Sequence, residues 1–135
     1  MAGYSLSPLE KKLGLKPGLK IKIINAPNGY FELFENFPIG DQDNGASMTK
    51  KDFIHYFTNS KVKLEEDICQ LKNDISQKGM LWISWPKKAS KTDTDLDGNM
   101  VRRIGLNNGL VDIKVCAIDE TWSGLKFVIP VKDRI

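Results

Sequence analysis

Four polar side chains of the central part of the chain have the types and spacing to hold an anion. Apolar residues 81–85 run into Pro86 and then into Lys87, Lys88, Ser90 and Lys91. An apolar run of this kind predicts a buried strand, and in open α/β sheets ligands bind beyond the carboxyl ends of the strands. We expect a helix to begin soon after these residues, and its partial positive charge would add to a site for a phosphate-like group. The alternative is a solvated loop whose lysines only keep the protein in solution.

Further residues join this predicted site from other loops. In a parallel sheet, residues 25–29, 58–60, 86–91 and 119–123 would meet at one edge. We therefore predict the following ligand-binding set and leave the catalytic residues unknown: Asn25, Asn28, Trp85, Lys87, Lys88, Ser90 and Trp122. Trp82 is three residues from Trp85 on the same strand, so the two rings should face opposite sides, with Trp82 in the core.

Other polar residues have competing interpretations. Asp119 and Glu120 are neighbours and would point to opposite faces of a strand, so they do not form an acid–base pair; one could form an ion pair with Lys87 or Lys88. His55 lies in the middle of a predicted strand, where packing is the commoner role. The Tyr30 hydroxyl could reach a ligand, or its ring could seat a short helix.

Metal and nucleotide motifs are not encoded. Residues 93–98 imitate a calcium loop, but its twelfth position is Ile104, where a glutamate is required. With one histidine and no C-x-x-C pair, Cys69 and Cys116 are predicted to be small buried side chains. Neither glycine-rich phosphate cradle is present, and no hydrolase elbow is present.

The elements that would position this site follow from periodicity and end signals. Ser7, Pro8 and Glu10 form a capping-box pattern for a short helix that Gly14 would stop. Strands are expected at 19–25, 52–58, 80–85, 111–118 and 125–131, with a weaker edge strand at 46–48 and a short helix at 30–34.

Two longer helices complete the pattern. An apolar stripe at Leu64, Ile68, Leu71 and Ile75 predicts a helix that Asn59 or Ser60 begins and Gly79 ends. A second capping box from Thr94 to Asp97 should open another helix.

The order of elements predicts an α/β fold. Alternating strands and helices indicate a small three-layer Rossmann-like domain over residues 1–135, with a mainly parallel sheet closed by a C-terminal antiparallel hairpin. No apolar run could span a membrane and no signal peptide is visible, so a cytoplasmic location is expected. The net charge of +3 is too small to predict nucleic-acid binding. The oligomeric state is not indicated.

Two resemblances support this interpretation. The segments Trp85-Pro86-Lys87-Lys88, 109–115 and 121–126 resemble a bacterial family of small α/β proteins of unknown function, over nearly the whole chain. The layout is also similar to adenosylmethionine-dependent methyltransferases, from the Lys16-Pro17-Gly18 turn to the closing hairpin. It departs from them after the first strand, where their acidic, glycine-rich motif is replaced by residues 25–29 and Pro27 removes a backbone donor.

The sequence leaves three functions open. The leading expectation is a protein that binds a small anionic ligand, phosphate- or nucleotide-like, at the carboxyl edge of the sheet. The alternatives are a reduced methyltransferase-like transferase and a protein-interaction module without enzymatic activity. The sequence leaves the cofactor unknown.

Overall fold

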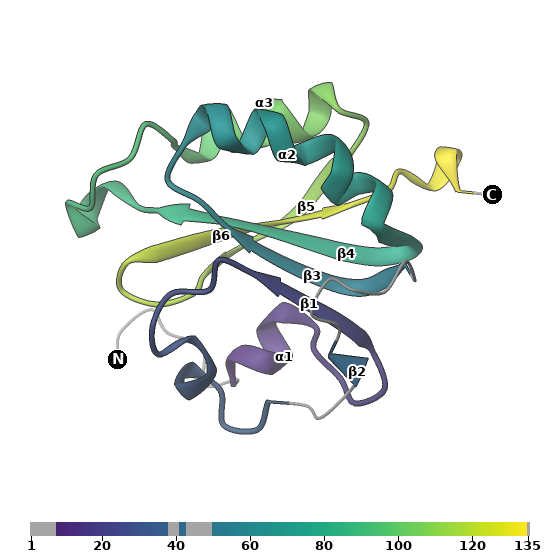
Figure 1. Cartoon of the computed structure of the whole chain (residues 1–135), viewed down its shortest axis with the longest axis horizontal. Helices are drawn as coiled ribbons and strands as arrows, with labels where there is room; N and C mark the ends of the chain where they lie inside the picture. The colour runs from purple at the N-terminus through teal and green to yellow at the C-terminus, as the bar shows by residue number, and fades with distance from the viewer. Residues whose placement is uncertain (1–7, 38–40, 43–49, 135) are drawn as a thin grey trace.

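The computed structural model describes residues 8–37, 41–42 and 50–134. Within these residues a six-stranded sheet has the strand order β2-β1-β3-β4-β6-β5. The strands, shown in Figure 1, are β1 (Lys20–Ile24), β2 (Asp41–Gln42), β3 (Lys51–Phe57), β4 (Ile75–Pro86), β5 (Val111–Ala117) and β6 (Trp122–Val128).

The directions of the strands confirm a mainly parallel sheet with an antiparallel close. β1 is parallel to β2 and β3, and β3 is parallel to β4. β6 is antiparallel to both of its neighbours, β4 and β5. The carboxyl ends of β1, β3 and β4 therefore share one edge of the sheet, and the turn between β5 and β6 lies at that same edge.

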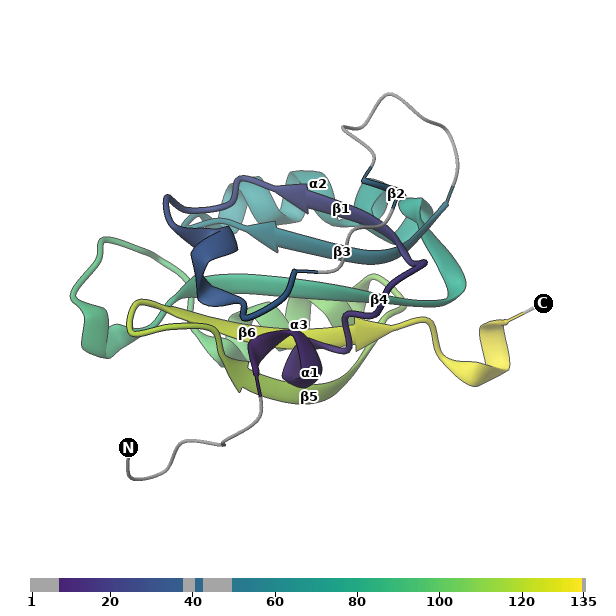
Figure 2. The same cartoon turned by 90° about the horizontal axis from the view of Figure 1, so that it is seen from below.

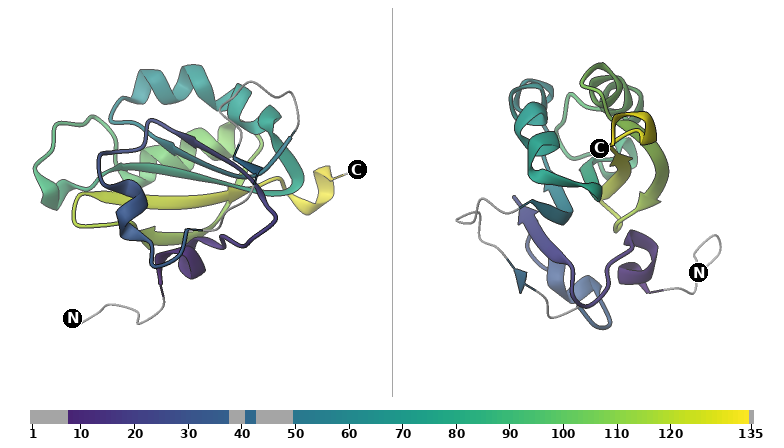
Figure 3. Two further views of the ribbon diagram at one scale, coloured as in Figure 1. Left: turned by 60° about the horizontal axis from the view of Figure 1, so that its bottom comes forward. Right: turned by 90° about the vertical axis from the view of Figure 1, so that its right-hand side faces the viewer.

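Helices cover both faces of the sheet, which confirms the three layers. α2 (Lys61–Asp74) and α3 (Gly98–Asn107) lie on one face, while α1 (Leu9–Leu13) and the 3-10 turn η1 (Tyr30–Leu33) lie on the other (Figures 1 and 3). Two further 3-10 turns are η2 (Lys88–Ser90) and η3 (Val131–Asp133). No helix within the described residues is long and apolar enough to cross a membrane.

Each face of the sheet has its own hydrophobic core. Leu64, Ile68 and Leu71 of the predicted stripe pack with Ile54, Ile83 and other residues under α2 and α3. The opposite core, under α1 and η1, contains Leu13, Tyr30, Phe53, Phe57 and Trp82. Separate cores on the two faces explain why β3 and β4 are apolar on both sides, as expected of central parallel strands.

The ends of α1 and the start of α2 can be compared with the capping residues predicted from the sequence. Gly14 ends α1 in the left-handed region at φ 84°, as predicted. Pro8 precedes α1 without a side-chain cap, and Ser7 and the predicted strand at 46–48 lie outside the described residues. The Ser60 hydroxyl accepts a hydrogen bond from the Lys63 amide at 3.2 Å and caps α2.

The prediction that Gly79 ends the second helix was wrong. α2 stops at Asp74, where Ile75 turns to an extended backbone and begins β4, so Gly79 lies inside a strand. A Cβ atom on Gly79 would stand 2.9 Å from the Lys51 carbonyl oxygen. The glycine therefore allows the close approach of β3 and β4 at the irregular register between Lys51 and Phe53.

The capping box from Thr94 to Asp97 was also misassigned. α3 begins three residues later than predicted, and its N-cap is Asp97, whose carboxylate accepts a hydrogen bond from the Met100 amide at 2.9 Å. The Thr94 hydroxyl instead accepts from the Leu96 amide at 3.1 Å, within the loop before the helix. A third correction concerns Cys69, which is exposed on α2, whereas Cys116 is buried as predicted.

Candidate functional site at the carboxyl edge of the sheet

The predicted loops do meet at one edge of the sheet. The Asn25 side chain donates to the Phe57 carbonyl at 3.3 Å, which joins the loop after β1 to the end of β3. The Thr58 amide donates to the Ser84 carbonyl at 3.1 Å, and the Lys87 amide donates to the Thr121 carbonyl at 2.9 Å. These hydrogen bonds link β1, β3, β4 and the β5–β6 turn across the edge.

The loop after β1 is a tight turn. Asn25 has a positive φ of 60°, a backbone conformation that asparagine tolerates better than most residues. The loop then closes on itself, because the Tyr30 amide donates to the Pro27 carbonyl at 3.1 Å. Asn28 is exposed in this loop and makes no hydrogen bond to a residue that the structure describes. Its amide is therefore accessible from solution.

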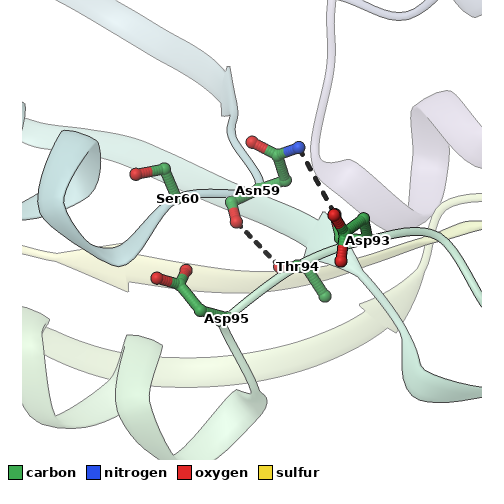
Figure 4. A pocket seen from close by; sticks show the side chains of 5 residues that line it. All are labelled: Asn59, Ser60, Asp93, Thr94 and Asp95. Atoms are coloured by element: carbon green, nitrogen blue, oxygen red, sulfur yellow. Dashed lines mark hydrogen bonds between the residues drawn. The ribbon is translucent and has the colours of Figure 1, made fainter.

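An open pocket of about 290 Å³ lies between the loop after β3 and the loop before α3. Figure 4 shows its lining, which consists of Asn59, Ser60, Asp93, Thr94 and Asp95. The two loops are fastened by Asn59, whose amide donates to the Asp93 carbonyl at 3.3 Å and whose carbonyl accepts from the Thr94 hydroxyl at 2.9 Å. This cross-link gives the pocket its shape.

The pocket is rich in hydrogen-bond acceptors. Its lining includes two carboxylates and no cation, so it suits ligand hydroxyl, amine or other cationic groups better than phosphate. Two amides at the N-terminus of α2 beside it are already engaged, because the Lys61 amide donates to the Asp95 carboxylate at 2.8 Å and the Lys63 amide to the Ser60 hydroxyl at 3.2 Å. These bonds leave fewer free N–H groups for an anion at this point.

The basic loop does not adjoin a helix N-terminus, which corrects the sequence-based expectation. Lys88 and Ser90 form the short turn η2, and α3 starts only at Gly98. The Ser90 hydroxyl donates to the Lys87 carbonyl at 2.6 Å and accepts from the Thr92 amide at 3.2 Å, so it is engaged within the turn. Lys88 and Lys91 are exposed and Lys87 is partly exposed. None of the three makes an ion pair with a described residue.

The tryptophans separate as the strand pattern predicted. Trp82 is fully buried under α1 and donates its indole N–H to the Leu13 carbonyl at 2.9 Å. Trp85 belongs to the opposite core and is also buried, with its ring against Gly98 at the start of α3. Trp122 is partly exposed and packs edge-on against Phe57, with 5.1 Å between ring centroids. Of the two rings assigned to a pocket, Trp122 is the accessible one.

Asp119 has a local structural role. Its carboxylate accepts hydrogen bonds from the Thr121 and Trp122 amides at 2.8 and 2.7 Å and thereby builds the β5–β6 turn. The predicted ion pair of Asp119 or Glu120 with Lys87 or Lys88 is not formed within the described residues. Among these residues, no group of three His, Cys, Asp or Glu side chains is arranged to hold a metal ion.

Tyr30 and His55 form a buried polar chain rather than part of the open edge. The Tyr30 hydroxyl is 2.8 Å from Nδ1 of His55, and Nε2 of His55 is 2.7 Å from the Ser84 hydroxyl. All three side chains are buried. Burial lowers the pKa of His55 to about 3, so the ring is neutral. The chain joins η1, β3 and β4 on the α1 face of the sheet.

Sequence reasoning missed most of the pocket lining. Residues 58–60 were placed at the correct edge, but Asp93, Thr94 and Asp95 were assigned to a rejected calcium loop and a helix start. The signal that could have found them is the density of acceptor side chains between the end of β4 and the first helical residue. The distance in sequence from Pro86, the end of β4, to Gly98, the start of α3, leaves a loop long enough to reach the end of β3.

Comparison with solved structures identifies the fold. A magnesium protoporphyrin IX methyltransferase from Synechocystis PCC 6803 is 14% identical, with a TM-score of 0.60 over 90% of this chain and 74% of that one. The N-methyltransferase NodS from Bradyrhizobium japonicum WM9 is 11% identical, with a TM-score of 0.60 over 90% and 92%.

A third similar structure is a TehB-like SAM-dependent methyltransferase from Corynebacterium glutamicum, 13% identical with a TM-score of 0.55 over 96% of this chain and 91% of that one. The chain therefore has the Rossmann-like fold of these enzymes, which confirms the fold-level likeness predicted from the sequence. No family model and no curated protein matches the chain. The resemblance to an uncharacterised bacterial family stays a prediction.

Proposed function

We propose that this chain binds an adenosyl ligand of the adenosylmethionine type at the carboxyl edge of the sheet, as a reduced methyltransferase-like transferase. The observation that supports the proposal is the sheet itself, with β6 inserted in reverse between β4 and β5. Three similar solved structures with this fold are methyltransferases, and one of them is described with bound SAM.

The chemistry of the edge fits part of such a ligand. The carboxylates of the pocket, chiefly that of Asp93, suit ribose hydroxyls and an amino group. Lys87 and Lys88 lie on the same edge and suit a carboxylate. The loop after β1 fits less well, because Pro27 offers no N–H and the Asn25 amide already donates to Phe57.

A bound adenosylmethionine would supply an electrophilic methyl group on its sulfonium, which an acceptor lone pair takes while the thioether leaves. The chain's own residues would bind and orient the ligand. Asn59 would hold the pocket open by fastening its two loops, and the carboxylates would offset the positive charge of the sulfonium.

Isothermal titration with adenosylmethionine and its demethylated product tests the proposal. We expect both to bind the wild type, and Asp93→Asn to weaken adenosylmethionine binding roughly tenfold or more, because a carboxylate contact to a charged group is worth about 1.5–3 kcal/mol. Asp133→Asn, an exposed carboxylate on η3, is the matched control and should bind normally. Absence of heat with both ligands would contradict the proposal.

A second candidate is the anion site predicted from the sequence, formed by Lys87 and Lys88 with Asn25, Asn28, Trp85, Ser90 and Trp122. It is favoured by the two lysines, which are at least partly exposed and have no ionic partner among the described residues. Asp93→Asn separates the two candidates, because Lys87 and Lys88 would contact the ligand in both. It should weaken adenosylmethionine binding and leave the binding of a nucleotide at the basic loop unchanged, whereas the Lys87→Ala, Lys88→Ala double variant should abolish that nucleotide binding.

A further inference from the structure

Three lysines from different elements gather on the α1 face of the sheet. Lys126 of β6 is directly opposite Trp82 of β4 and Lys114 of β5 in the sheet register. Directly opposite residues point to the same face. Trp82 lies under α1, because its indole donates to the Leu13 carbonyl. The third lysine, Lys12, is on α1 itself, which crosses β5 and β6 in Figure 2.

Contacts place the ammonium groups of Lys114 and Lys126 at the same end of α1. The Lys114 ammonium donates to the Lys12 carbonyl at 2.9 Å, near the end of α1. A Cβ atom on Gly14 would stand 3.8 Å from the Lys126 ammonium, which puts this group at the same end of the helix. Burial raises the pKa of the Cys116 thiol, and the charges of Lys12 and Lys114 oppose that rise. The three lysines thus add positive charge to one end of α1.

No described acidic residue neutralises this cluster. None of the three lysines makes an ion pair within the described residues. The one acidic residue of α1, Glu10, directs its carboxylate to the amides of Glu35 and Asn36, at 3.3 and 2.6 Å. Among the described residues, therefore, no carboxylate forms an ion pair with the cluster.

Lys126 is the member of the cluster whose ammonium is partly desolvated by burial. It is partly buried and makes no hydrogen bond within the described residues. Burial first, and the charge of Lys114 second, lower the pKa of its ammonium. Like charges held together in a partly desolvated place raise the free energy of the folded state, and a bound anion would relieve that repulsion.

We infer that Lys12, Lys114 and Lys126 form an anion-binding site on the α1 face, which takes a phosphate group of a small molecule. A phosphate offers several acceptor oxygens around one centre, so ammonium groups arriving from α1, β5 and β6 can each donate to a different oxygen. The site lies at the level of Trp82, four residues before β4 ends at Pro86, so it is separate from the carboxyl edge and does not rest on the function proposed there.

A purely structural role for the lysines explains only part of this arrangement. Cations near the C-terminus of a helix stabilise its last carbonyl groups, and the bond from Lys114 to the Lys12 carbonyl is such a contact. Lys126 makes no contact of this kind. The behaviour of Lys126 variants therefore separates the two explanations.

The experiment is a titration of pyrophosphate at constant ionic strength, balanced with chloride, against four proteins. The wild type and Lys126→Arg should bind. Lys126→Met, which keeps the apolar stem and removes the charge, should bind at least roughly tenfold more weakly, because one charge-assisted contact is lost. Lys132→Met, at an exposed lysine on η3 outside both candidate sites, should bind as the wild type does. Without ligand, Lys126→Met should unfold at a higher temperature than the wild type.

Several results would overturn the inference. These are the absence of pyrophosphate binding by the wild type, equal binding by the wild type and Lys126→Met, and an equal loss of binding in Lys132→Met. A lower unfolding temperature of ligand-free Lys126→Met would show that the ammonium already stabilises the fold, and would also contradict it. A Lys114→Met variant repeats the test at the second strand if Lys126→Met does not fold.

Discussion

His55 on β3 and Ser84 on β4 are joined by a hydrogen bond of 2.7 Å between Nε2 and the hydroxyl, inside the sheet and out of reach of solvent. The other ring nitrogen bonds to the Tyr30 hydroxyl at 2.8 Å. A neutral imidazole donates from one nitrogen and accepts at the other, so both bonds are satisfied without a charge. These two hydrogen bonds, from Tyr30 through His55 to Ser84, stabilise the folded state only while the His55 ring stays neutral.

Stability should therefore fall in mild acid. The pKa of His55 drops from an ordinary 6.5 to about 3 on folding, so between these values the unfolded chain binds a proton that the folded chain does not. The contribution of the neutral ring is complete above about pH 6.5 and is lost at up to about 1.4 kcal/mol per pH unit as the pH falls. Urea unfolding of the wild type and His55→Gln at pH 7.5 and 5 measures it. The difference in unfolding free energy between them should shrink at pH 5, and a difference that does not depend on pH would disprove the assignment.

Removing either partner of His55 should destabilise the protein. Ser84→Ala and Tyr30→Phe each leave a buried ring nitrogen without a partner, which costs about 1–3 kcal/mol of unfolding free energy. Ser123→Ala on the neighbouring β6 is a matched control, because its hydroxyl is partly exposed and makes no hydrogen bond within the described residues. Equal losses of unfolding free energy for Ser84→Ala and Ser123→Ala in chemical denaturation would argue against a stabilising role for the Tyr30–His55–Ser84 hydrogen bonds.

Gly105 sets the distance between α3 and the sheet. A Cβ atom there would stand 2.2 Å from the ring of Phe127, so Gly105→Ala forces the helix or the ring to move. We expect a loss of about 1–3 kcal/mol of unfolding free energy. Adding Phe127→Leu should recover part of it, whereas Leu106→Ala, on the exposed side of the helix, should have little effect. Failure of the double variant to recover any stability would contradict this packing.

The start of α3 depends on Asp97 rather than on Thr94. Asp97→Ala removes the cap of the Met100 amide and should cost about 1 kcal/mol, while Asp97→Asn keeps most of it. Thr94→Ala should leave the helix intact and loosen the loop beside the pocket. Amide hydrogen exchange distinguishes these effects, with faster exchange at 98–101 in the first variant and at 94–96 in the last.

The two cysteines should react at very different rates. Cys69 is exposed on α2, whereas Cys116 is buried and burial raises the pKa of its thiol. A thiol reagent at pH 8 should therefore label one site quickly and the second only after unfolding. Cys69→Ser removes the fast phase if the assignment is correct, and a fast phase that persists in this variant would contradict it.

Local patterns identified β1, β3, β4, β5 and β6 and the edge where their loops meet, but not the short strand β2. The apolar runs around Ile54 and Ile83 identified the central strands because each is buried on both faces, and the order of elements then implied parallel pairing. The loops of Asn25, Asn59 and Lys87 meet at one edge as a direct consequence of that pairing. The reversed β6 followed from the short turn at Thr121.

The errors share a physical cause, which is that long-range contacts override local signals. Gly79 is a good helix terminator, yet the close approach of β3 to the Lys51 carbonyl requires it inside a strand. Thr94 has the spacing of a cap, yet its hydroxyl is used by Asn59, a residue far away in sequence. His55 was correctly assigned to packing, but its two partners come from η1 and β4 and no sequence spacing identifies them. The cluster around Lys126 escaped notice for the same reason.

The inserted strand β6 also has a consequence for how the protein is made. Five of the six strands precede it in the chain, yet β5 is hydrogen-bonded to the sheet only through β6. While the chain leaves the ribosome, one edge of β4 keeps its backbone N–H and C=O groups unpaired until residues up to Val128 have emerged. During that interval the nascent chain offers a sheet edge to chaperones or to neighbouring copies, and the last strand to be synthesised is the one that closes it.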